Sequence, residues 1–193
     1  MLYTQLFITL PALLSTLALT HASPLLPRAS ASTCTPNFQG RQQTIFVRPP
    51  ITDIGVYEWT PESIFPGAHV TLQQRDVNSA FATGEFLVQF TGQPNGSFHF
   101  RLAAETNRYT ALTAGAGGTL AFDILSETSI PSQEFTISCT TCPSFDGEGG
   151  TDARGCTIAH PASGTCIAGS EDGDTLYLAD CGSAGVYSLW EGF

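Results

Sequence analysis

Leu120-Ala121-Phe122 and Phe135-Thr136-Ile137 are two short apolar motifs that recur, in the same order, earlier and later in the chain. Each motif places apolar residues at alternate positions, as a half-buried β-strand does. Two further pairs match them: Val70-Thr71-Leu72 with Phe86-Leu87-Val88, and Leu176-Tyr177-Leu178 with Tyr187-Ser188-Leu189. Two motifs in three ordered copies predict an internal threefold repeat.

The rest of the mature chain holds more short alternating stretches, such as Thr44-Ile45-Phe46-Val47 and Phe98-His99-Phe100-Arg101-Leu102, separated by Gly, Pro, Asn or Ser. Regularly spaced strands of this kind predict an all-β sandwich or barrel. Copies of about 50 residues cannot each bury a core, whereas closing three of them around an axis pools their apolar faces and removes the sheet edges. We therefore predict an all-β chain with a β-trefoil domain at 34–193; the alternative is a two-sheet sandwich.

The charge balance excludes two kinds of partner. The 193 residues contain 17 Asp and Glu against 7 Lys and Arg, giving a formal net charge of −10, and all seven cations are Arg. Gripping nucleic acid or anionic lipid needs clustered cations that replace phosphate counterions. We expect no nucleic-acid partner, no membrane partner and weak affinity for anionic polymers.

The beginning of the chain predicts export. Leu6 to Leu19 is a mostly apolar run that ends in small residues, with Ala22 at the expected cleavage position. This pattern is typical of a secretory signal peptide, here 1–22, although Met1 to Gln5 carry no Lys or Arg. The segment 23–33 follows, and Arg28 is a candidate for a second processing cut. The run is too short to span a bilayer, so we expect a secreted, extracellular protein.

Cysteine usage agrees with export, because an even number in an exported chain favours disulfides over thiols or metal. Six cysteines allow 15 pairings. The preferred set joins neighbouring strands through Cys166–Cys181 and Cys142–Cys156, which leaves Cys34–Cys139. A redox or zinc role for Cys139-Thr140-Thr141-Cys142 is disfavoured, since the preceding residues are strand-like and a second similarly spaced pair is missing.

The third copy has the order Cys, turn, aliphatic strand, second Cys and closing aromatic strand, in Gly164-Thr165-Cys166-Ile167, then Gly173 to Cys181, then Tyr187-Ser188-Leu189-Trp190. In this order it resembles the ricin-B-type lectin repeat. The second copy carries the closing motif as Gln133-Glu134-Phe135. The chain also looks like a group of small secreted fungal proteins without assigned activity, through Cys34-Thr35-Pro36-Asn37-Phe38, Thr91 to Pro94, and Phe135 to Cys142.

The resemblance implies a sugar site whose residues are mostly replaced. In galactose-binding repeats an Asp accepts from sugar hydroxyls, an aromatic ring covers the apolar sugar face, and an Asn precedes the closing Gln. The corresponding positions are Ala168, Ala179 and Ala184-Gly185 in the third copy, and near Ala111 and Asp123 in the second. Gln133 survives. In the first copy Tyr57 and Trp59, with Glu58 and Glu62, lie near the right place, although Trp59 is also expected as a buried core ring.

Other candidate sites have plainer interpretations. The carboxylates of Glu171-Asp172-Gly173-Asp174 are expected at a solvated hairpin tip, because calcium needs more oxygen ligands in a fixed order. His69, His99 and His160 share no metal spacing, so no metal or cofactor is expected. His160 and Ser163 lie close in sequence, but no catalytic nucleophile with base and orienting acid is recognisable. Asn95-Gly96-Ser97 is the one glycosylation sequon.

These features predict a secreted, monomeric, non-catalytic recognition module for an extracellular glycan or protein, with glycan binding preferred and Tyr57, Trp59 and Gln133 as candidate ligand contacts. The first alternative is a trefoil-type protease inhibitor that presents Arg48-Pro49-Pro50 or Ser129-Ile130-Pro131 to an enzyme. The second is a secreted hydrolase.

Overall fold

The described part of the chain contains twelve β-strands and three short 3-10 helices, η2 (Ala116–Gly118), η3 (Pro131–Gln133) and η4 (Cys181–Ser183). The computed structural model describes residues 32–36, 38, 42–47, 57–74, 86–91, 96–103, 109–142, 153–169, 171 and 173–190, all within one unit, Ala31–Phe193. The strands are β1 (Gln42–Val47), β2 (Tyr57–Pro61), β3 (Val70–Gln74), β4 (Phe86–Phe90), β5 (Phe98–Leu102), β6 (Thr110–Ala114), β7 (Leu120–Ile124), β8 (Thr136–Ser138), β9 (Ala153–His160), β10 (Thr165–Ala168), β11 (Tyr177–Ala179) and β12 (Tyr187–Trp190).

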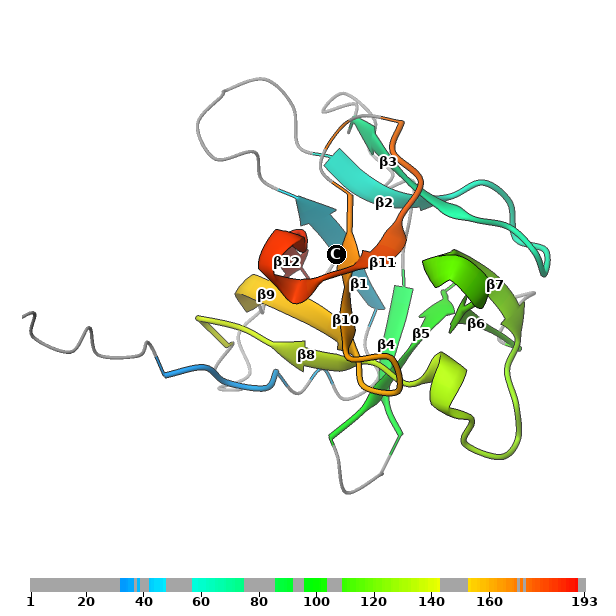
Figure 1. Cartoon of the computed structure of the whole chain (residues 1–193), viewed down its shortest axis with the longest axis horizontal. Helices are drawn as coiled ribbons and strands as arrows, with labels where there is room; N and C mark the ends of the chain where they lie inside the picture. The colour runs from blue at the N-terminus through cyan, green and yellow to red at the C-terminus, as the bar shows by residue number, and fades with distance from the viewer. Residues whose placement is uncertain are drawn as a thin grey trace, which may run out of the picture. The chain divides into compact units, whose positions relative to one another are not determined.

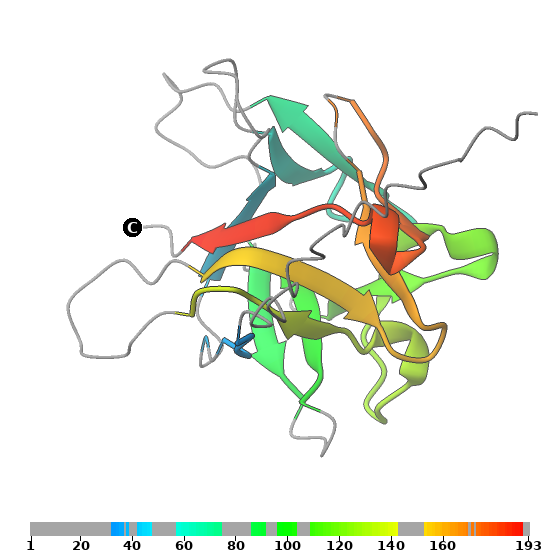
Figure 2. The ribbon, with the colours of Figure 1, turned by 60° about the vertical axis from the view of Figure 1, so that its left-hand side comes forward.

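Six of the strands close into a barrel. β1 pairs with both β12 and β4, β4 pairs with β5, and β8 and β12 both pair with β9. The ring closes through Phe98 and Phe135, which exchange two backbone hydrogen bonds of 2.6 and 3.0 Å between β5 and the start of β8. Figure 2 shows β12 in red lying between β1 in blue and β9 in yellow. Every barrel strand is antiparallel to its neighbours.

The other six strands form three hairpins, which are β2–β3, β6–β7 and β10–β11. Isolated bridges tie the hairpins to one another: His69 pairs with Ala121, Thr71 with Thr175, and Thr119 with Tyr177. Each hairpin therefore contacts the other two, as Figure 1 shows for β11 beside β3 and β7. A six-stranded barrel with a layer of three mutually bridged hairpins is a β-trefoil, which confirms the predicted fold and excludes the two-sheet sandwich.

The predicted repeat coincides with this architecture. The first motif of each copy falls at β3, β7 and β11, and the second at β4, β8 and β12. Equivalent positions are equally buried: Val70, Leu120 and Leu176 are inaccessible, and so are Phe86, Phe135 and Tyr187. The alternating pattern thus has a direct cause, because the same residues of each copy point at a shared core.

Aromatic rings fill the centre of that core. Trp59 contacts Phe86, Phe100 and Tyr187 at ring-centroid distances of 5.9, 5.7 and 5.2 Å. Burying rings of this size contributes much of the hydrophobic stabilisation, and edge-to-face pairs add to it. The three strands that supply these partners belong to different copies, so the core joins the repeats into one folding unit.

Three disulfides link the six cysteines: Cys34–Cys142, Cys139–Cys156 and Cys166–Cys181. The predicted Cys166–Cys181 bridge is correct, but the other two predicted pairs are wrong because their partners are exchanged. Cys34 and Cys139 do lie opposite each other, where they exchange two backbone hydrogen bonds. Cys139, however, lies on β8's continuation beside β9, with its Cα 3.9 Å from that of Cys156, so its sulfur bonds across to β9 and Cys34 reaches Cys142.

A β-bulge at Arg154 and Gly155 sets the path of β9. The N–H of Thr140 donates to the carbonyl oxygens of both residues, at 3.1 and 3.3 Å. Gly155 has φ +62, and a Cβ there would lie 2.2 Å from Oγ1 of Thr140. Only glycine meets both conditions without strain, since L side chains disfavour this backbone region and the space is already filled.

Several sequence predictions concern residues outside the described ranges. They are the signal peptide 1–22, the cut after Arg28, the sequon at Asn95 and the loop Arg48-Pro49-Pro50, and they stay predictions. Within the ranges that are described, no helix has the length and apolar character needed to cross a bilayer.

Candidate recognition surface

The hairpin layer carries a half-exposed aromatic ring close to where the three hairpins meet. Tyr177 begins β11 and keeps 50% of its surface accessible, whereas Leu176 beside it is fully buried. Strand geometry explains the difference, because successive side chains point to opposite faces. Leu176 faces the core, so Tyr177 faces outward.

Exposed hydroxyl groups flank this ring. Thr119 is the bridge partner of Tyr177, so the two side chains lie on the same face, and Thr175 lies on that face two residues earlier in the chain. The Thr119 hydroxyl donates to the carbonyl of Ala116 at 3.2 Å, which fixes its position. Gly118 allows the turn before β7 to pack closely against β11, since a Cβ at Gly118 would lie 3.0 Å from the carbonyl oxygen of Leu178.

A flat ring bordered by hydroxyl groups suits a ligand that has one apolar and one polar face. Sugars have this character, because the C–H groups of a pyranose stack on aromatic rings while its hydroxyls exchange hydrogen bonds. Sequence reasoning missed Tyr177. The signal was present nonetheless, since Leu176 and Leu178 both face the core in a period-two strand and the residue between them therefore points outward.

Trp59, the predicted aromatic platform, is a core residue. It has no accessible surface, and its ring is enclosed by Phe86, Phe100 and Tyr187. A ligand at the surface cannot reach it, so the interpretation as a buried ring is correct and its use as a platform is not. Tyr57, two residues earlier, is half-buried and packs against the core while pairing with Val47 and Gln74.

Gln133 is buried as well, and it braces a loop. It is 1% exposed; its Nε2 donates to Oγ1 of Thr113 at 3.0 Å and to the carbonyl of Ile124 at 2.9 Å, and its Oε1 accepts from the N–H of Ser126 at 3.1 Å. These bonds engage both the oxygen and the nitrogen of the amide with protein partners. The predicted ligand contact at Gln133 is therefore a structural brace, and the structure does not bring it together with Tyr57 or Trp59.

The third copy replaces this brace with a tyrosine hydroxyl. The position of Gln133 is taken by Gly185, and a Cβ there would lie 2.4 Å from Oη of Tyr187. That hydroxyl donates to the carbonyl of Ile167 at 3.2 Å, and the N–H of Gly185 donates to the same oxygen. Burial raises the pKa of Tyr187, with a smaller contribution from Tyr177 in the same direction. Ring and glycine together fill the space that glutamine occupies in the second copy.

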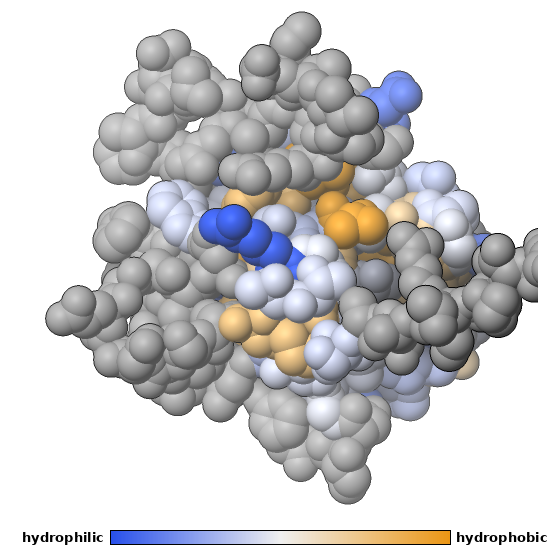
Figure 3. Space-filling view, turned by 90° about the vertical axis from the view of Figure 1, so that its left-hand side faces the viewer, coloured by the Kyte–Doolittle hydropathy of each residue, from blue (hydrophilic) through white to orange (hydrophobic). Residues whose placement is uncertain are grey.

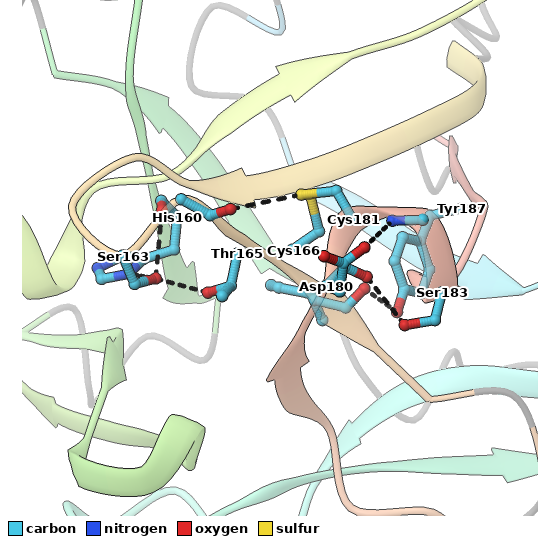
Figure 4. Close-up of a disulfide and its surroundings, with 11 residues drawn as sticks. His160, Ser163, Thr165, Cys166, Asp180, Cys181, Ser183 and Tyr187 are labelled. Carbon is cyan, nitrogen blue, oxygen red and sulfur yellow. Dashed lines mark hydrogen bonds between the residues drawn. A yellow bond between two sulfur atoms is a disulfide. The ribbon is translucent and has the colours of Figure 1, made fainter.

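His160, Ser163 and Thr165 form a hydrogen-bond network at the β9–β10 turn (Figure 4). Nε2 of His160 lies 2.9 Å from the carbonyl oxygen of Pro131, which can only accept, so Nε2 donates this hydrogen bond. Nδ1 lies 2.7 Å from the Ser163 hydroxyl, which is also hydrogen-bonded to the hydroxyl of Thr165. The N–H groups of Ser163 and Gly164 also donate to the His160 carbonyl. The hydrogen-bond network therefore holds the turn in place and, through Pro131, the loop that precedes β8.

His99 lies on the outer wall of the barrel, half-buried, between two inward phenylalanines. This agrees with the predicted outward direction, although His99 is less exposed than a plain surface histidine. Burial lowers the pKa of His99 below its ordinary value of 6.5; Glu134 acts in the opposite direction, and Arg101 adds to the lowering. Arg101 also donates to Oε1 of Gln89 at 2.9 Å.

The acidic turn after β10 is organised by its own backbone. Asp174 accepts from the N–H of Glu171 through Oδ2 at 2.9 Å, and Gly173 has φ +82. Asp172 lies outside the described residues. Among the side chains that the structure describes, no three His, Cys, Asp or Glu lie close enough to hold a metal ion.

Comparison with known proteins adds one structural likeness. No family model matches the chain, and no curated protein does. The chain is similar to a designed threefold-symmetric protein, ThreeFoil, with 13% sequence identity and a TM-score of 0.48, over 78% of this chain and 96% of the designed one. The β-trefoil assignment rests on the strand pairing of the present chain, and the resemblance to ricin-B-type repeats stays a prediction from motifs.

Proposed function

We propose that this protein is a secreted, non-catalytic recognition module that binds an extracellular glycan with the hairpin layer around Tyr177. The trefoil fold is compatible with a binding module of this kind. The half-exposed ring of Tyr177, beside the hydroxyls of Thr119 and Thr175, is the observation that carries the proposal. Tyr177 would take the role of the aromatic ring that covers the sugar face, because the corresponding ricin-B-type position in the third copy is Ala179.

The distribution of exposed apolar residues supports a surface specialised in this way. Five of the six large apolar side chains exposed in the described ranges belong to the hairpins or directly adjoin their strands: Ile64, Phe65, Tyr109, Ile124 and Tyr177. Among the coloured residues of the face in Figure 3, hydrophobic areas adjoin hydrophilic ones. Exposed apolar residues gathered on one part of a surface are typical of binding sites.

Export is part of the proposal. Three disulfides fit a chain that folds in an oxidising environment, and the predicted leader at 1–22 would deliver it there. N-terminal sequencing of the protein recovered from culture medium tests this. A start after Ala22 or after Arg28 is expected, and retention of residues 1–22 in the cell would contradict it.

A glycan array with matched variants tests the binding. We expect wild-type protein to bind a limited set of glycans, and Tyr177→Ala to weaken binding about fivefold, because a stacked ring contributes about 1 kcal/mol. Tyr109→Ala is the control, since this ring is 77% exposed at another place. Equal loss in both variants, or no glycan bound by wild type, would overturn the proposed site.

One observation favours protease inhibition as a second candidate function. The loop from Leu125 to Pro131 is exposed at its centre, yet buried side chains hold both ends: Gln133 bonds Ser126, and His160 bonds Pro131. A loop held in one conformation loses little entropy when it enters an enzyme cleft. Inhibition of one endopeptidase in a panel, lost in Ile130→Glu and kept in Val186→Ser, together with an empty glycan array, would put this function first.

A further inference from the structure

A second exposed surface lies beside the β6–β7 hairpin, where the turn between β2 and β3 reaches it. The N–H of Gly67 donates to the carbonyl of Phe122 at 2.7 Å, and the N–H of Phe122 donates to the carbonyl of Ala68 at 2.8 Å. Figure 1 shows this turn next to β7. Residues of the two segments therefore adjoin each other, although they are about 50 positions apart in the sequence.

These segments expose apolar and acidic residues together. Ile64 is 39% accessible, Phe65 66% and Ile124 65%, and the side chains of Glu62 and Asp123 are exposed in the same two segments. We call these five residues the tip patch. Phe65 and Ile124 are large apolar groups outside any core, and groups of this kind mark contact sites when they gather.

The carboxylates of the tip patch are held in place by backbone donors. Oε2 of Glu62 accepts from the N–H of His69 at 3.3 Å, and Oδ1 of Asp123 accepts from the N–H of Ile124 at 2.7 Å. The described ranges 57–74 and 109–142, which hold both carboxylates, contain no Lys or Arg. Glu127 adds a further exposed negative charge three residues after Ile124.

We propose that the tip patch docks a cationic amphipathic polypeptide segment of another protein that reaches around the exposed end of β7, where Asp123 and Ile124 point to opposite sides. Its apolar side chains contact Phe65 and Ile124, and its Lys or Arg side chains face Glu62 and Asp123. Charge complementarity selects this occupant. A second copy of the chain would bring like charges together, since the whole sequence has a net charge of −10, and an anionic membrane surface would be repelled for the same reason. The surface is separate from the ring of Tyr177.

Two model peptides test this proposal: an amphipathic Leu-Lys peptide and its Leu-Glu counterpart, each labelled for fluorescence anisotropy with the full mature protein. The Leu-Lys peptide is expected to bind, and its affinity is expected to fall as the salt concentration rises, because exposed charges are screened. The Leu-Glu peptide is expected not to bind. In NMR spectra of the labelled protein, shifts on adding Leu-Lys peptide are expected around residues 62–68 and 121–127.

Variants assign the binding to the patch. Phe65→Ser is expected to weaken Leu-Lys binding about tenfold at any salt concentration, as the loss of one apolar anchor does. Glu62→Gln with Asp123→Asn is expected to flatten the salt dependence. The controls, Val186→Ser and Glu171→Gln, change an exposed apolar residue and an exposed acid elsewhere.

Four results would overturn the proposal: equal binding of both peptides, equal loss in the controls, displacement of the peptide by a glycan that needs Tyr177, or concentration-dependent self-association that Phe65→Ser abolishes. The substituted side chains are all exposed, so unchanged thermal melting is expected to show that each variant folds. Because Tyr177 is not in the patch, this test and the glycan array can fail independently.

Discussion

At the scale of the residue, Gly155 is a position where a side chain meets both backbone strain and a steric clash. Its backbone has φ +62, and the side chain of Thr140 fills the space next to its Cα. Gly155→Ala is expected to lower the free energy of unfolding by about 2 kcal/mol or more, because a left-handed backbone costs about 1 to 3 kcal/mol for a residue with a Cβ and Thr140 must also move. Chemical denaturation followed by fluorescence measures the loss.

Gly164→Ala separates the two contributions. Gly164 has φ +68, but no atom lies within 4 Å of where its Cβ would be. Only the backbone cost applies there, so a loss of about 1 kcal/mol is expected. If the two variants lose the same stability, the contact with Thr140 contributes nothing.

His99 is expected to make the free energy of unfolding fall as the pH becomes mildly acidic. Its pKa in the folded protein is below the ordinary 6.5 because burial disfavours the charged ring. Below pH 6.5 the unfolded chain binds the proton first, so the free energy of unfolding is expected to fall as pH drops through 6.5 toward the lowered value, and to be unaffected by His99 above it.

Two variants check the role of His99 in denaturation curves recorded at neutral and mildly acidic pH. His99→Gln is expected to lose less stability on acidification than wild type. Glu134→Gln is expected to lose more, since Glu134 is the group that raises the pKa of His99. A His99→Gln variant with the wild-type pH dependence would show that other groups control this range.

Two buried residues show where sequence reasoning ended. Trp59 is expected from the sequence as a buried core ring, and the structure agrees, because the side chain has no accessible surface. The brace made by Gln133 and its replacement by the Tyr187 hydroxyl depend on contacts between residues 20 positions apart. A pattern in one strand contains no information on which distant carbonyl a side chain reaches.

At the scale of the elements, the strands and their threefold order could be predicted because each copy repeats the same apolar spacing. The disulfide pairing could not, except for Cys166–Cys181, whose cysteines lie on β10 and directly after the adjacent β11. Cys34, Cys139, Cys142 and Cys156 gather at one place. Their pairing depends on which sulfurs face each other across the β8–β9 ladder, and this cannot be predicted from the spacing of the cysteines in the sequence.

The disulfides are expected to differ in what they contribute. Cys34–Cys142 closes a loop with a sequence separation of 108, and Cys166–Cys181 one of 15. In the chain-entropy model these loops correspond to about 4.7 and about 3 kcal/mol. Cys34→Ala with Cys142→Ala is therefore expected to destabilise the protein more than Cys166→Ala with Cys181→Ala, as measured by denaturant unfolding.

Mass spectrometry of the unreduced protein provides the independent check, using fragmentation that breaks the chain between Cys139 and Cys142. It is expected to find Cys139 joined to Cys156 and Cys142 joined to Cys34. Recovery of the exchanged pairs, Cys34–Cys139 and Cys142–Cys156, would show that the arrangement of this end of the barrel described above is incorrect.

At the scale of the whole molecule, the excess of acidic residues controls long-range behaviour. With 17 Asp and Glu against 7 Arg, the protein is expected to pass a heparin column without retention at low salt, because polyanions are repelled before any contact forms. Retention that salt reverses would require a local cluster of cations. The described residues include only Arg101 and Arg154, which lie on different strands.

The closed ring of barrel strands also affects how readily the protein can aggregate. Fibril growth by strand addition needs a row of unpaired backbone N–H and C=O groups that an incoming chain can extend. Each barrel strand here has hydrogen-bonded neighbours on both sides, so the native barrel offers no such template. Aggregation should then depend on opening the ring first, and conditions that reduce the bridges at the β8–β9 end should promote it.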